Sequence, residues 1–303
     1  MSVVLCGIGL RNPVIAASGT FGYGVEFERI VDLEKLGAFV VKGLSREPIR
    51  GNPPPRLWET SDGMINSVGL QNVGVKAFVA GKLPLLRRFN TPVFANVFGY
   101  AVEDYCEVVR VLEDAEGVAA YELNVSCPNT KCGGMQFGSD PAMLASVVEP
   151  VRKLSRRPVI VKLSPNVDRI EPLAQAAEAA GADAVSLVNT FLALSIDPVS
   201  RTPRIGNGMG GLSGPAIKPI ALRMVAQAAL AVRVPVIGMG GIACGEDAAE
   251  FLTAGASAVE VGTASFWDPR ATVRIARELE RFLASERVAR AADLSGTLKP
   301  WPA

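Results

Sequence analysis

The sequence predicts a (β/α)8 barrel with long loops over the C-terminal face of its strands, formed by residues 1–303 as a single domain. Three observations support this fold class. Short β-branched apolar runs recur along the chain, helix-like segments follow most of them, and Gly-Ala turns, which end a helix and begin a strand, precede several. Runs that are apolar on both faces are typical of a parallel sheet covered by helices. Eight such units in roughly 250 residues match the size of this barrel.

The predicted strands extend from near the N-terminus almost to the last helix. They span residues 14–18, 38–42, 92–97, 119–125, 158–163, 184–189, 235–239 and 258–262. Helices are expected at residues 171–180, 218–232, 247–253 and about 270–285, the last with Asp268 as its N-cap. Two connections, residues 43–90 and 191–235, are too long for plain βα loops. Both leave from C-terminal strand ends, where barrel enzymes keep their sites.

The composition narrows the classes of function. Thirty-one basic and thirty acidic residues leave a formal charge of +1, which argues against a nucleic-acid or membrane-surface protein. No apolar run is long enough to cross a bilayer, and the first residues lack the basic start of a secretion signal, so we expect a cytoplasmic protein. The five cysteines form no C-x-x-C pair, which favours free thiols over disulfides, zinc or an iron–sulfur cluster. Because the chain has no histidine, acid–base chemistry must come from other residues.

Polar side chains stand at most of the predicted strand ends. They are Ser18, Lys42, Asn96, Asn124 with Cys127, Lys162, and Asn189 with Thr190. An apolar barrel core would not tolerate this set, since lysine is rarely buried unless it is paired. If one or two strands were misplaced, these residues would instead lie in solvent. Polar residues at six of the eight predicted strand ends favour a site at the mouth of the barrel.

The last two strands end in glycine, at Gly240-Gly241 and at Gly262-Thr263. Backbone amides after the seventh and eighth strands commonly bind phosphate in barrels, although tight turns with positive φ are the alternative. We expect a phosphorylated cofactor across strands five to eight, with Lys162 facing a flavin edge or a phosphate. Residues 238–243 also match the dinucleotide pattern G-x-G-x-x-A, but the downstream Glu260 lies inside its strand, which argues against that fold.

Cys127 follows the fourth strand in the segment Asn-Val-Ser-Cys-Pro-Asn, residues 124–129. A buried structural thiol is the commonest role of a cysteine. A general base on a strand-end loop is the sharper interpretation, because a thiol titrates near pH 8.5 and modest stabilisation of the thiolate makes it useful at neutral pH. A nucleophile is less attractive, since the sequence offers no base partner. The glycine-containing segment 130–140 that follows has the composition of a mobile lid.

Several motifs taken together resemble the dihydroorotate dehydrogenases, flavin-dependent enzymes of pyrimidine synthesis. The resemblance runs over about residues 5–270. The motifs that carry it are residues 12–22, Lys42-Gly43, residues 66–72, residues 124–129, residues 210–215 and residues 240–242. A cysteine in the position of the base resembles the soluble class 1 enzymes. Residues 17–22 and 211–219 resemble the NAD-linked class 1B branch, so the chain is identified as similar to its catalytic subunit.

The resemblance implies a mechanism and a set of binding residues. Cys127 takes the proton from C5 of dihydroorotate while hydride leaves C6 for N5 of FMN. The residues implied to bind the substrate are Lys42, Asn66, Val68, Gly69, Leu70, Asn124, Asn129, Asn189 and Thr190. Those implied to bind FMN are Ala17, Ser18, Lys42, Gly43, Asn96, Asn124, Lys162, Val188, Gly214, Gly240, Gly241, Gly262 and Thr263.

The resemblance also implies a partner. In class 1B, a second subunit that carries FAD and a [2Fe-2S] cluster passes the electrons to NAD+, in a heterotetramer of two subunits of each kind. Thr130 and Cys132 depart from the expected lid sequence, which puts its dynamics or redox sensitivity in doubt but not the reaction.

Four alternatives remain open. Within the oxidoreductases they are a class 1A enzyme, which reduces fumarate unaided, and a relative of dihydropyrimidine dehydrogenase, which acts on neutral pyrimidines. From other classes they are a non-redox barrel isomerase or lyase acting on a phosphorylated metabolite, and a pure binding protein. The third predicts a carboxylate at the mouth, but no predicted strand ends in Asp or Glu.

Overall fold

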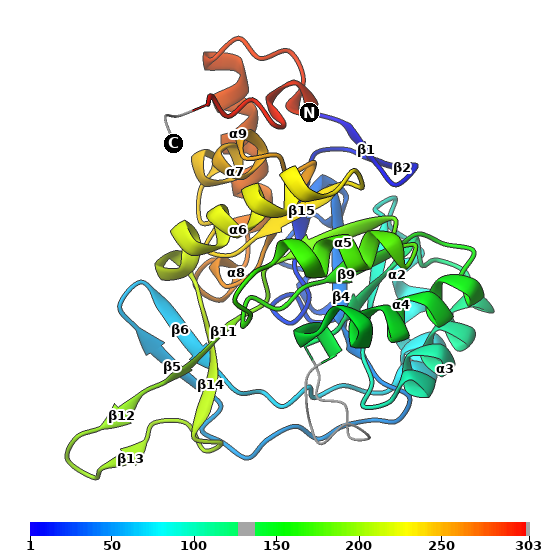
Figure 1. Cartoon of the computed structure of the whole chain (residues 1–303), viewed down its shortest axis with the longest axis vertical. Coiled ribbons are helices and arrows are strands. Elements are labelled where there is room, and N and C mark those ends of the chain that lie inside the picture. Colours follow the sequence, from blue (N-terminus) through cyan, green and yellow to red (C-terminus); the bar gives the residue numbers. More distant parts are fainter. Residues whose placement is uncertain (127–136, 301–303) are drawn as a thin grey trace.

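The computed structural model describes residues 1–126 and 137–300, and it contains a closed barrel of parallel strands (Figure 1). The barrel strands follow one another around the ring in chain order, which confirms the predicted fold class. They are β3 (Val14–Ala16), β4 (Ala38–Leu44), β7 (Val93–Val97), β8 (Ala120–Asn124), β9 (Val159–Lys162), β10 (Ala184–Leu187), β15 (Val236–Met239) and β16 (Ala258–Val261). Each strand falls within its predicted range or overlaps it, because buried parallel strands read as continuous apolar runs.

Helices cover the outside of the barrel between most of its strands. They are α3 (Val102–Glu113), α4 (Pro141–Leu154), α5 (Glu171–Ala179), α6 (Lys218–Ala231), α7 (Gly245–Thr253), α8 (Ala264–Trp267) and α9 (Ala271–Ser285). Between β3 and β4 the described chain forms only short 3-10 turns, at Val25–Phe27 and Leu33–Lys35. The sequence predicted Asp268 as the N-cap of α9, and this prediction is wrong. Arg270 holds that position, and the Asp268 carboxylate accepts a hydrogen bond from its backbone N–H at 2.9 Å.

A hairpin closes the N-terminal end of the barrel (Figure 1). Its strands are β1 (Val3–Leu5) and β2 (Ile8–Leu10), and the turn between them places Cys6 and Gly7 at positive φ, as a tight hairpin requires. Leu5 and Leu10 pack into the lumen against apolar residues of the barrel strands. This end of the barrel is therefore a filled core without room for a ligand.

The two long connections pair with each other into an antiparallel sheet, which projects from the barrel at the lower left of Figure 1. Its strand order is β11 (Phe191–Leu194), β14 (Met209–Ser213), β6 (Gly63–Asn66) and β5 (Leu57–Thr60), and β12 (Ile196–Asp197) and β13 (Thr202–Pro203) form a further hairpin. The remaining elements of the described chain are short. They are α1 (Val75–Ala77), a π-helical turn at Phe78–Lys82, α2 (Leu83–Leu86), and 3-10 turns at Phe137–Ser139, Pro215–Ile217 and Ala291–Leu294. No helix in the described ranges is long and apolar enough to span a membrane.

Along the barrel axis, the side chains that line the lumen change from apolar to polar between residues two apart on the same strand. Successive side chains of a strand point to opposite faces, so residues two apart share the lumen. Six strands step in this way from an apolar residue of the lower core to a polar residue above it. The pairs are Val40 and Lys42, Phe94 and Asn96, Ala120 and Glu122, Ile160 and Lys162, Ala184 and Ser186, and Ala258 and Glu260. The upper layer of the lumen is therefore a polar floor beneath the C-terminal mouth.

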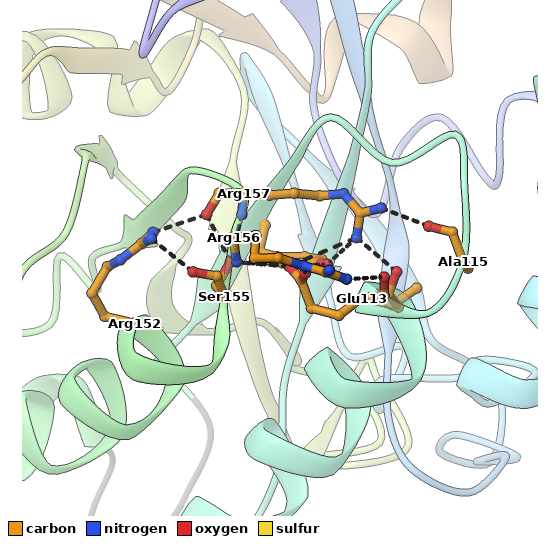
Figure 2. A network of polar contacts seen from close by, with 8 residues as sticks. Glu113, Ala115, Arg152, Ser155, Arg156 and Arg157 are labelled. Atoms are coloured by element: carbon orange, nitrogen blue, oxygen red, sulfur yellow. Dashed lines mark hydrogen bonds and ion pairs between the residues drawn. The ribbon is translucent and has the colours of Figure 1, made fainter.

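A second polar network lies at the N-terminal ends of β8 and β9, around the carboxylate of Glu113 (Figure 2). Glu113 Oε1 accepts hydrogen bonds from the Tyr121 hydroxyl at 3.0 Å and from the Arg156 backbone N–H at 3.1 Å. Arg156 Nε donates to Oε2 at 2.8 Å, and the Arg157 guanidinium donates to the carbonyls of Leu112 and Ala115. These bonds join the end of α3 to the turn between α4 and β9.

Candidate functional site

A cavity of about 580 Å³ opens at the C-terminal ends of the barrel strands, between the mouth and the antiparallel sheet. Every residue that the sequence analysis placed in the site and that the structure describes lines this one cavity. They are Ala17, Ser18, Lys42, Gly43, Asn66, Val68, Gly69, Leu70, Asn96, Asn124, Lys162, Val188, Asn189, Thr190, Gly214, Gly240, Gly241, Gly262 and Thr263. Cys127 and Asn129 lie outside the described residues, as does most of the predicted lid. The individual binding roles stay predictions.

Glycines at the ends of β15 and β16 shape one wall of the cavity. Gly240 and Gly241 have φ of +122° and +85°, and a side chain at Gly240 would meet Ala221 at 2.6 Å, so both positions require glycine for the turn. Gly262 differs, because a Cβ there would meet no atom of the described chain closer than 3.7 Å. The protein alone does not require glycine at this position. The space beside its backbone leaves room for a bound group.

The same wall offers unused hydrogen-bond donors. No hydrogen bond among the described residues takes the backbone N–H groups of Gly241 and Ile242 after β15, or of Thr263 and Ala264 after β16. Unpaired N–H groups that converge at the edge of a cavity form a site for an anion. This wall therefore fits a phosphate.

The floor of the cavity contains two buried glutamates and one lysine from three different strands. Lys162 Nζ lies 3.3 Å from Glu122 Oε1 and 3.5 Å from Glu260 Oε2. Asn96 donates a 2.6 Å hydrogen bond to Glu122 Oε1, and the Ser186 hydroxyl donates one of 2.9 Å to Glu122 Oε2. All five side chains are almost completely buried.

Burial and neighbouring charge move the pKa values of this cluster apart. Burial favours the neutral form of Glu122, but the Lys162 charge and hydrogen bonds from neighbouring side chains, Asn96 and Ser186 among them, outweigh it and lower its pKa. Burial and the Glu122 charge together raise the pKa of Glu260 well above its ordinary value. Burial opposes the charge on Lys162, yet the two carboxyl groups outweigh it and raise the Lys162 pKa. The floor is therefore a charged pair, Glu122 and Lys162, beside a neutral carboxylic acid.

Lys42 brings a second ammonium to the cavity. No hydrogen bond or ion pair among the described residues reaches it, and burial lowers its pKa. A lysine that is mostly buried without a protein partner is unfavourable unless a ligand supplies the counter-charge. Lys42 is consequently the group in this site best placed to meet an anionic ligand.

Side-chain amides stand around the mouth. Asn189 Nδ2 donates to Asn124 Oδ1 at 3.3 Å and to the Ser126 hydroxyl at 3.0 Å, and the Tyr105 hydroxyl holds the Asn124 carbonyl at 2.8 Å. Across the cavity, Asn66 Nδ2 donates to the Gly211 carbonyl at 3.2 Å. These contacts fix the directions in which the amides present their remaining donors and acceptors. The arrangement suits a planar ligand that carries both carbonyl and N–H groups.

Sequence reasoning missed several residues of the site. Glu122 and Glu260 were passed over because they lie inside their strands, and Ser186 because it ends no run. The signal was present, since each of them stands two residues after an apolar residue of the lumen. Further lining residues that were not predicted are Asn52, Ser126, Asn166, Asn207, Phe266 and Trp267. The first four come from loops, where periodicity gives no signal, and Phe266 and Trp267 come from the short helix α8.

Comparison with known proteins identifies the family. A family model described as dihydroorotate dehydrogenase matches residues 1–283, most of the chain. The chain belongs to the dihydroorotate dehydrogenase family. This confirms the resemblance drawn from the motifs. The catalytic subunit of the NAD(+)-linked dihydroorotate dehydrogenase B from Pelobacter propionicus is 56% identical, over 99% of this chain and 98% of its own length. Its counterpart from Geobacter sp. strain M21 is 54% identical over the same shares.

Another dihydroorotate dehydrogenase relative carries a different class name. A protein from Solibacter usitatus, named a putative dihydroorotate dehydrogenase A (fumarate), is 69% identical over 99% of this chain and 98% of its own length. The names of the relatives therefore agree on the substrate of the family and differ on the electron acceptor.

Proposed function

We propose that this chain oxidises (S)-dihydroorotate to orotate in de novo pyrimidine biosynthesis, as a single FMN-binding domain of residues 1–303. One observation carries the proposal: a single cavity gathers an anion-binding wall, a floor that contains a buried lysine, a second lysine without a partner among the described residues, and a ring of amides. Membership of the dihydroorotate dehydrogenase family supports the reaction. The absence of histidine from the whole chain fits a cysteine as the base.

FMN fits the cavity from the eighth strand to the fifth. When bound, FMN supplies the two-electron acceptor for hydride transfer. The unused N–H groups after β15 and β16 would hold its phosphate, and the space at Gly262 accommodates a group lying against the backbone. Lys162, in the floor of the cavity, would supply a positive charge to the ring. The family's use of this cofactor agrees with that assignment.

Dihydroorotate would lie over the FMN ring, within reach of the amides. Lys42 would pair with its carboxylate, which supplies the negative charge that the protein does not provide. Asn66, Asn124 and Asn189 would meet the carbonyl and N–H groups of the pyrimidine ring, together with the loop at Val68–Leu70 and with Thr190 and Asn129. A neutral pyrimidine would leave Lys42 without a partner, so this lysine favours dihydroorotate over the dihydropyrimidines.

Cys127 would act as the general base that removes the proton from C5 while hydride leaves C6. Its position in the chain supports this role, because Asn124 and Ser126, which immediately precede it, line the cavity. Among the described residues, Glu260 is the one lining residue that carries a carboxyl group. The Glu260 carboxyl lies in the floor with the Lys162 ammonium 3.5 Å from its Oε2.

The electrons would pass to NAD+ through a second subunit that carries FAD and a [2Fe-2S] cluster, in a cytoplasmic heterotetramer of two subunits of each kind. The relatives named as catalytic subunits support the existence of a partner. Exposed apolar side chains near the cavity rim, including Leu192, Phe266 and Trp267, provide a surface for assembly. The fumarate-linked name of the 69% identical relative makes direct reduction of fumarate the second candidate.

An anaerobic titration of the purified chain tests the proposal. Dihydroorotate should bleach the visible band of the bound flavin. Addition of fumarate should leave the band bleached, whereas NAD+ with the electron-transfer subunit should restore it. Reoxidation by fumarate alone would move the chain to the second candidate. A flavin that dihydroorotate does not reduce would overturn the assigned substrate.

Replacement of the base provides a matched test. Cys127→Ser should retain FMN yet reduce dihydroorotate turnover by about two to four orders of magnitude at neutral pH, because serine is a far weaker base. Cys6→Ser, at the closed end of the barrel, should turn over like the wild type. Equal turnover of the Cys127 variant and the wild type would remove Cys127 from the mechanism.

A further inference from the structure

Two buried carboxyl groups share one ammonium in the floor of the cavity. The side chains of Glu122 and Glu260 are 1% and 0% exposed, and that of Lys162 is 6% exposed. Charges held at this depth are unfavourable unless they are paired and hydrogen-bonded. One lysine balances one carboxylate, so the second carboxyl group is most stable when it is protonated.

The hydrogen bonds show which carboxyl group is neutral. Glu122 receives donors on both of its oxygens, from Asn96 and Lys162 on Oε1 and from Ser186 on Oε2, as a carboxylate requires. Glu260 receives only the longer contact from Lys162, and its Oε1 has no partner among the described residues. Glu122 is thus the charged member and Glu260 the protonated one.

The position of Glu260 connects it to the ligand. Glu260 and Lys162 line the cavity, whereas Glu122 lies behind them. The strands of the two glutamates, β8 and β16, are separated by three strands on either side of the ring. The ammonium is therefore held from opposite walls of the barrel, with Glu260 on the wall that ends in Gly262 and Thr263. An unpaired, fully buried oxygen at this place is a hydrogen-bonding position for a bound molecule.

We propose that Glu260 is a positioning residue: it stands in the floor as a neutral carboxylic acid, holds the Lys162 ammonium beneath the cofactor ring, and thereby sets the reduction potential of the bound flavin. This inference rests on the proposed function, because it requires FMN in the cavity. It assigns a role to a residue that lies inside its strand.

The charges of Lys162 and Glu122 should shift the reduction potential of the flavin in opposite directions. The Lys162 ammonium stabilises the electron pair gained by the ring, and the Glu122 carboxylate opposes it. Without Glu260 Oε2, the ammonium would relax toward Glu122 and away from the cavity, which lowers the potential. A glutamine at position 260 keeps the oxygen acceptor and the neutral charge, so it should preserve both the position of Lys162 and the potential.

Spectroelectrochemical titration of the FMN-loaded chain at pH 7 tests this scheme. Glu260→Ala should lower the potential by the equivalent of at least a tenfold change in equilibrium constant, which is about 30 mV for a two-electron couple. Glu260→Gln should restore the wild-type potential. Glu122→Gln, made in the Glu260→Gln chain so that Glu260 cannot ionise in its place, should raise it by a comparable amount, because a fixed negative charge is removed. Glu113→Gln, the same change at the closed end of the barrel, should have no effect.

The outcomes separate this inference from the function on which it rests. If Glu260→Gln raised the potential as far as Glu122→Gln does, Glu260 would be charged and the inference would be wrong. If Glu260→Ala left the potential unchanged, Glu260 would not position Lys162. In either case, the proposed function stands if dihydroorotate bleaches the flavin bound to the wild-type chain. A wild-type chain that binds no FMN would overturn both.

A measurement on the wild type does not depend on the folding of any variant. Infrared difference spectra between the oxidised and the reduced, FMN-loaded chain should contain the carbonyl stretch of a protonated carboxylic acid, shifted in D2O. The band should be present, because reduction changes the field at Glu260. Its absence would contradict a neutral Glu260.

Discussion

The barrel has two glutamate networks of similar residues, one at its closed end and one at its open end. At the closed end, Glu113 accepts hydrogen bonds on both oxygens, and its basic partners reach solvent, with the Arg156 side chain 77% exposed. At the open end, Glu260 is fully buried, shares its lysine with Glu122 and leaves one oxygen unpaired. Burial favours the neutral form of Glu113, but hydrogen bonds from Arg156 and Tyr121 outweigh it and lower the pKa. Burial instead raises the pKa of Glu260.

This difference separates a stabilising network from a functional one. A satisfied network that joins α3 to the α4–β9 turn contributes to the free energy of unfolding. A buried ion pair with a surplus carboxyl group is weak evidence for stability, because its desolvation offsets the attraction. The floor therefore needs another explanation, and the cavity above it provides one.

Removal of the shared cation should have the largest effect. In Lys162→Met the Glu122 carboxylate is left buried without a counter-ion, so the unfolding free energy of the flavin-free chain should fall by about 3–5 kcal/mol. The double variant Lys162→Met, Glu122→Gln should regain most of this loss. Urea unfolding measures both. A single variant as stable as the double variant would mean that Glu122 carries no charge.

Lys42 tests whether an unpaired cation at the mouth serves binding alone. Lys42→Ala should weaken orotate binding by roughly 1.5–3 kcal/mol, the value of a charge-assisted hydrogen bond. Its unfolding free energy should not decrease, because no described residue pairs with the ammonium. Lys35→Ala, which removes a surface lysine paired with Asp32, is the control for both quantities. Wild-type affinity for orotate in the Lys42 variant would exclude this lysine from the substrate site.

Glu113 tests the opposite case, a network that should affect the stability of the chain but not its binding of FMN. Glu113→Gln should lower the unfolding free energy by about 1–3 kcal/mol, since it weakens hydrogen bonds to a mostly buried carboxylate. Its FMN affinity, measured by quenching of flavin fluorescence, should match the wild type. Glu107→Gln, which removes an exposed pair with Arg110, should change the stability by less than about 0.5 kcal/mol. A loss of FMN binding in the Glu113 variant would break the separation between the two networks.

The pH dependence of stability should differ in sign between the networks. The pKa of Glu260 is raised, so the folded chain keeps a proton that the unfolded chain releases near pH 4.3. Its contribution is complete below that pH and falls by up to about 1.4 kcal/mol per pH unit as the pH rises toward the folded pKa. The pKa of Glu113 is lowered, so its contribution is complete above the unfolded value and is lost as the pH falls.

Unfolding measured across this range separates the two groups. Between about pH 5 and pH 7 the wild type should lose stability relative to Glu260→Gln, whereas its difference from Glu113→Gln should stay constant. Parallel curves for the wild type and Glu260→Gln would show that Glu260 ionises normally.

The sequence predicted the barrel better than its floor. Eight apolar runs located the strands because burial on both faces leaves a continuous signal. The residues at strand ends were found for the same reason, and those described gather around one cavity. Glu122 and Glu260 were not predicted as site residues because each is a charged residue inside a predicted apolar strand and not at its end. Only the pleat of the closed barrel places them beside Lys162.

The antiparallel sheet over the mouth was beyond sequence reasoning for a different reason. Its strands come from two loops that are far apart in the chain, and their pairing, such as that of Leu212 with Ile65, is a long-range contact. The residues that these loops add to the cavity, among them Asn52 and Asn207, follow from that pairing. Local periodicity carries no information about it.

The most direct test of the account is a barrel with a floor free of charge. The triple variant Lys162→Met, Glu122→Gln, Glu260→Gln keeps approximately the size of each side chain, and the amide introduced at position 122 keeps an acceptor for Asn96 and offers a donor to the Ser186 hydroxyl oxygen. We predict that, without flavin, it unfolds in urea with a free energy no lower than that of the wild type, while its affinity for FMN falls at least tenfold. A variant that loses several kcal/mol of stability and binds FMN as tightly as the wild type would contradict the account, because the floor would then be a structural network like that of Glu113.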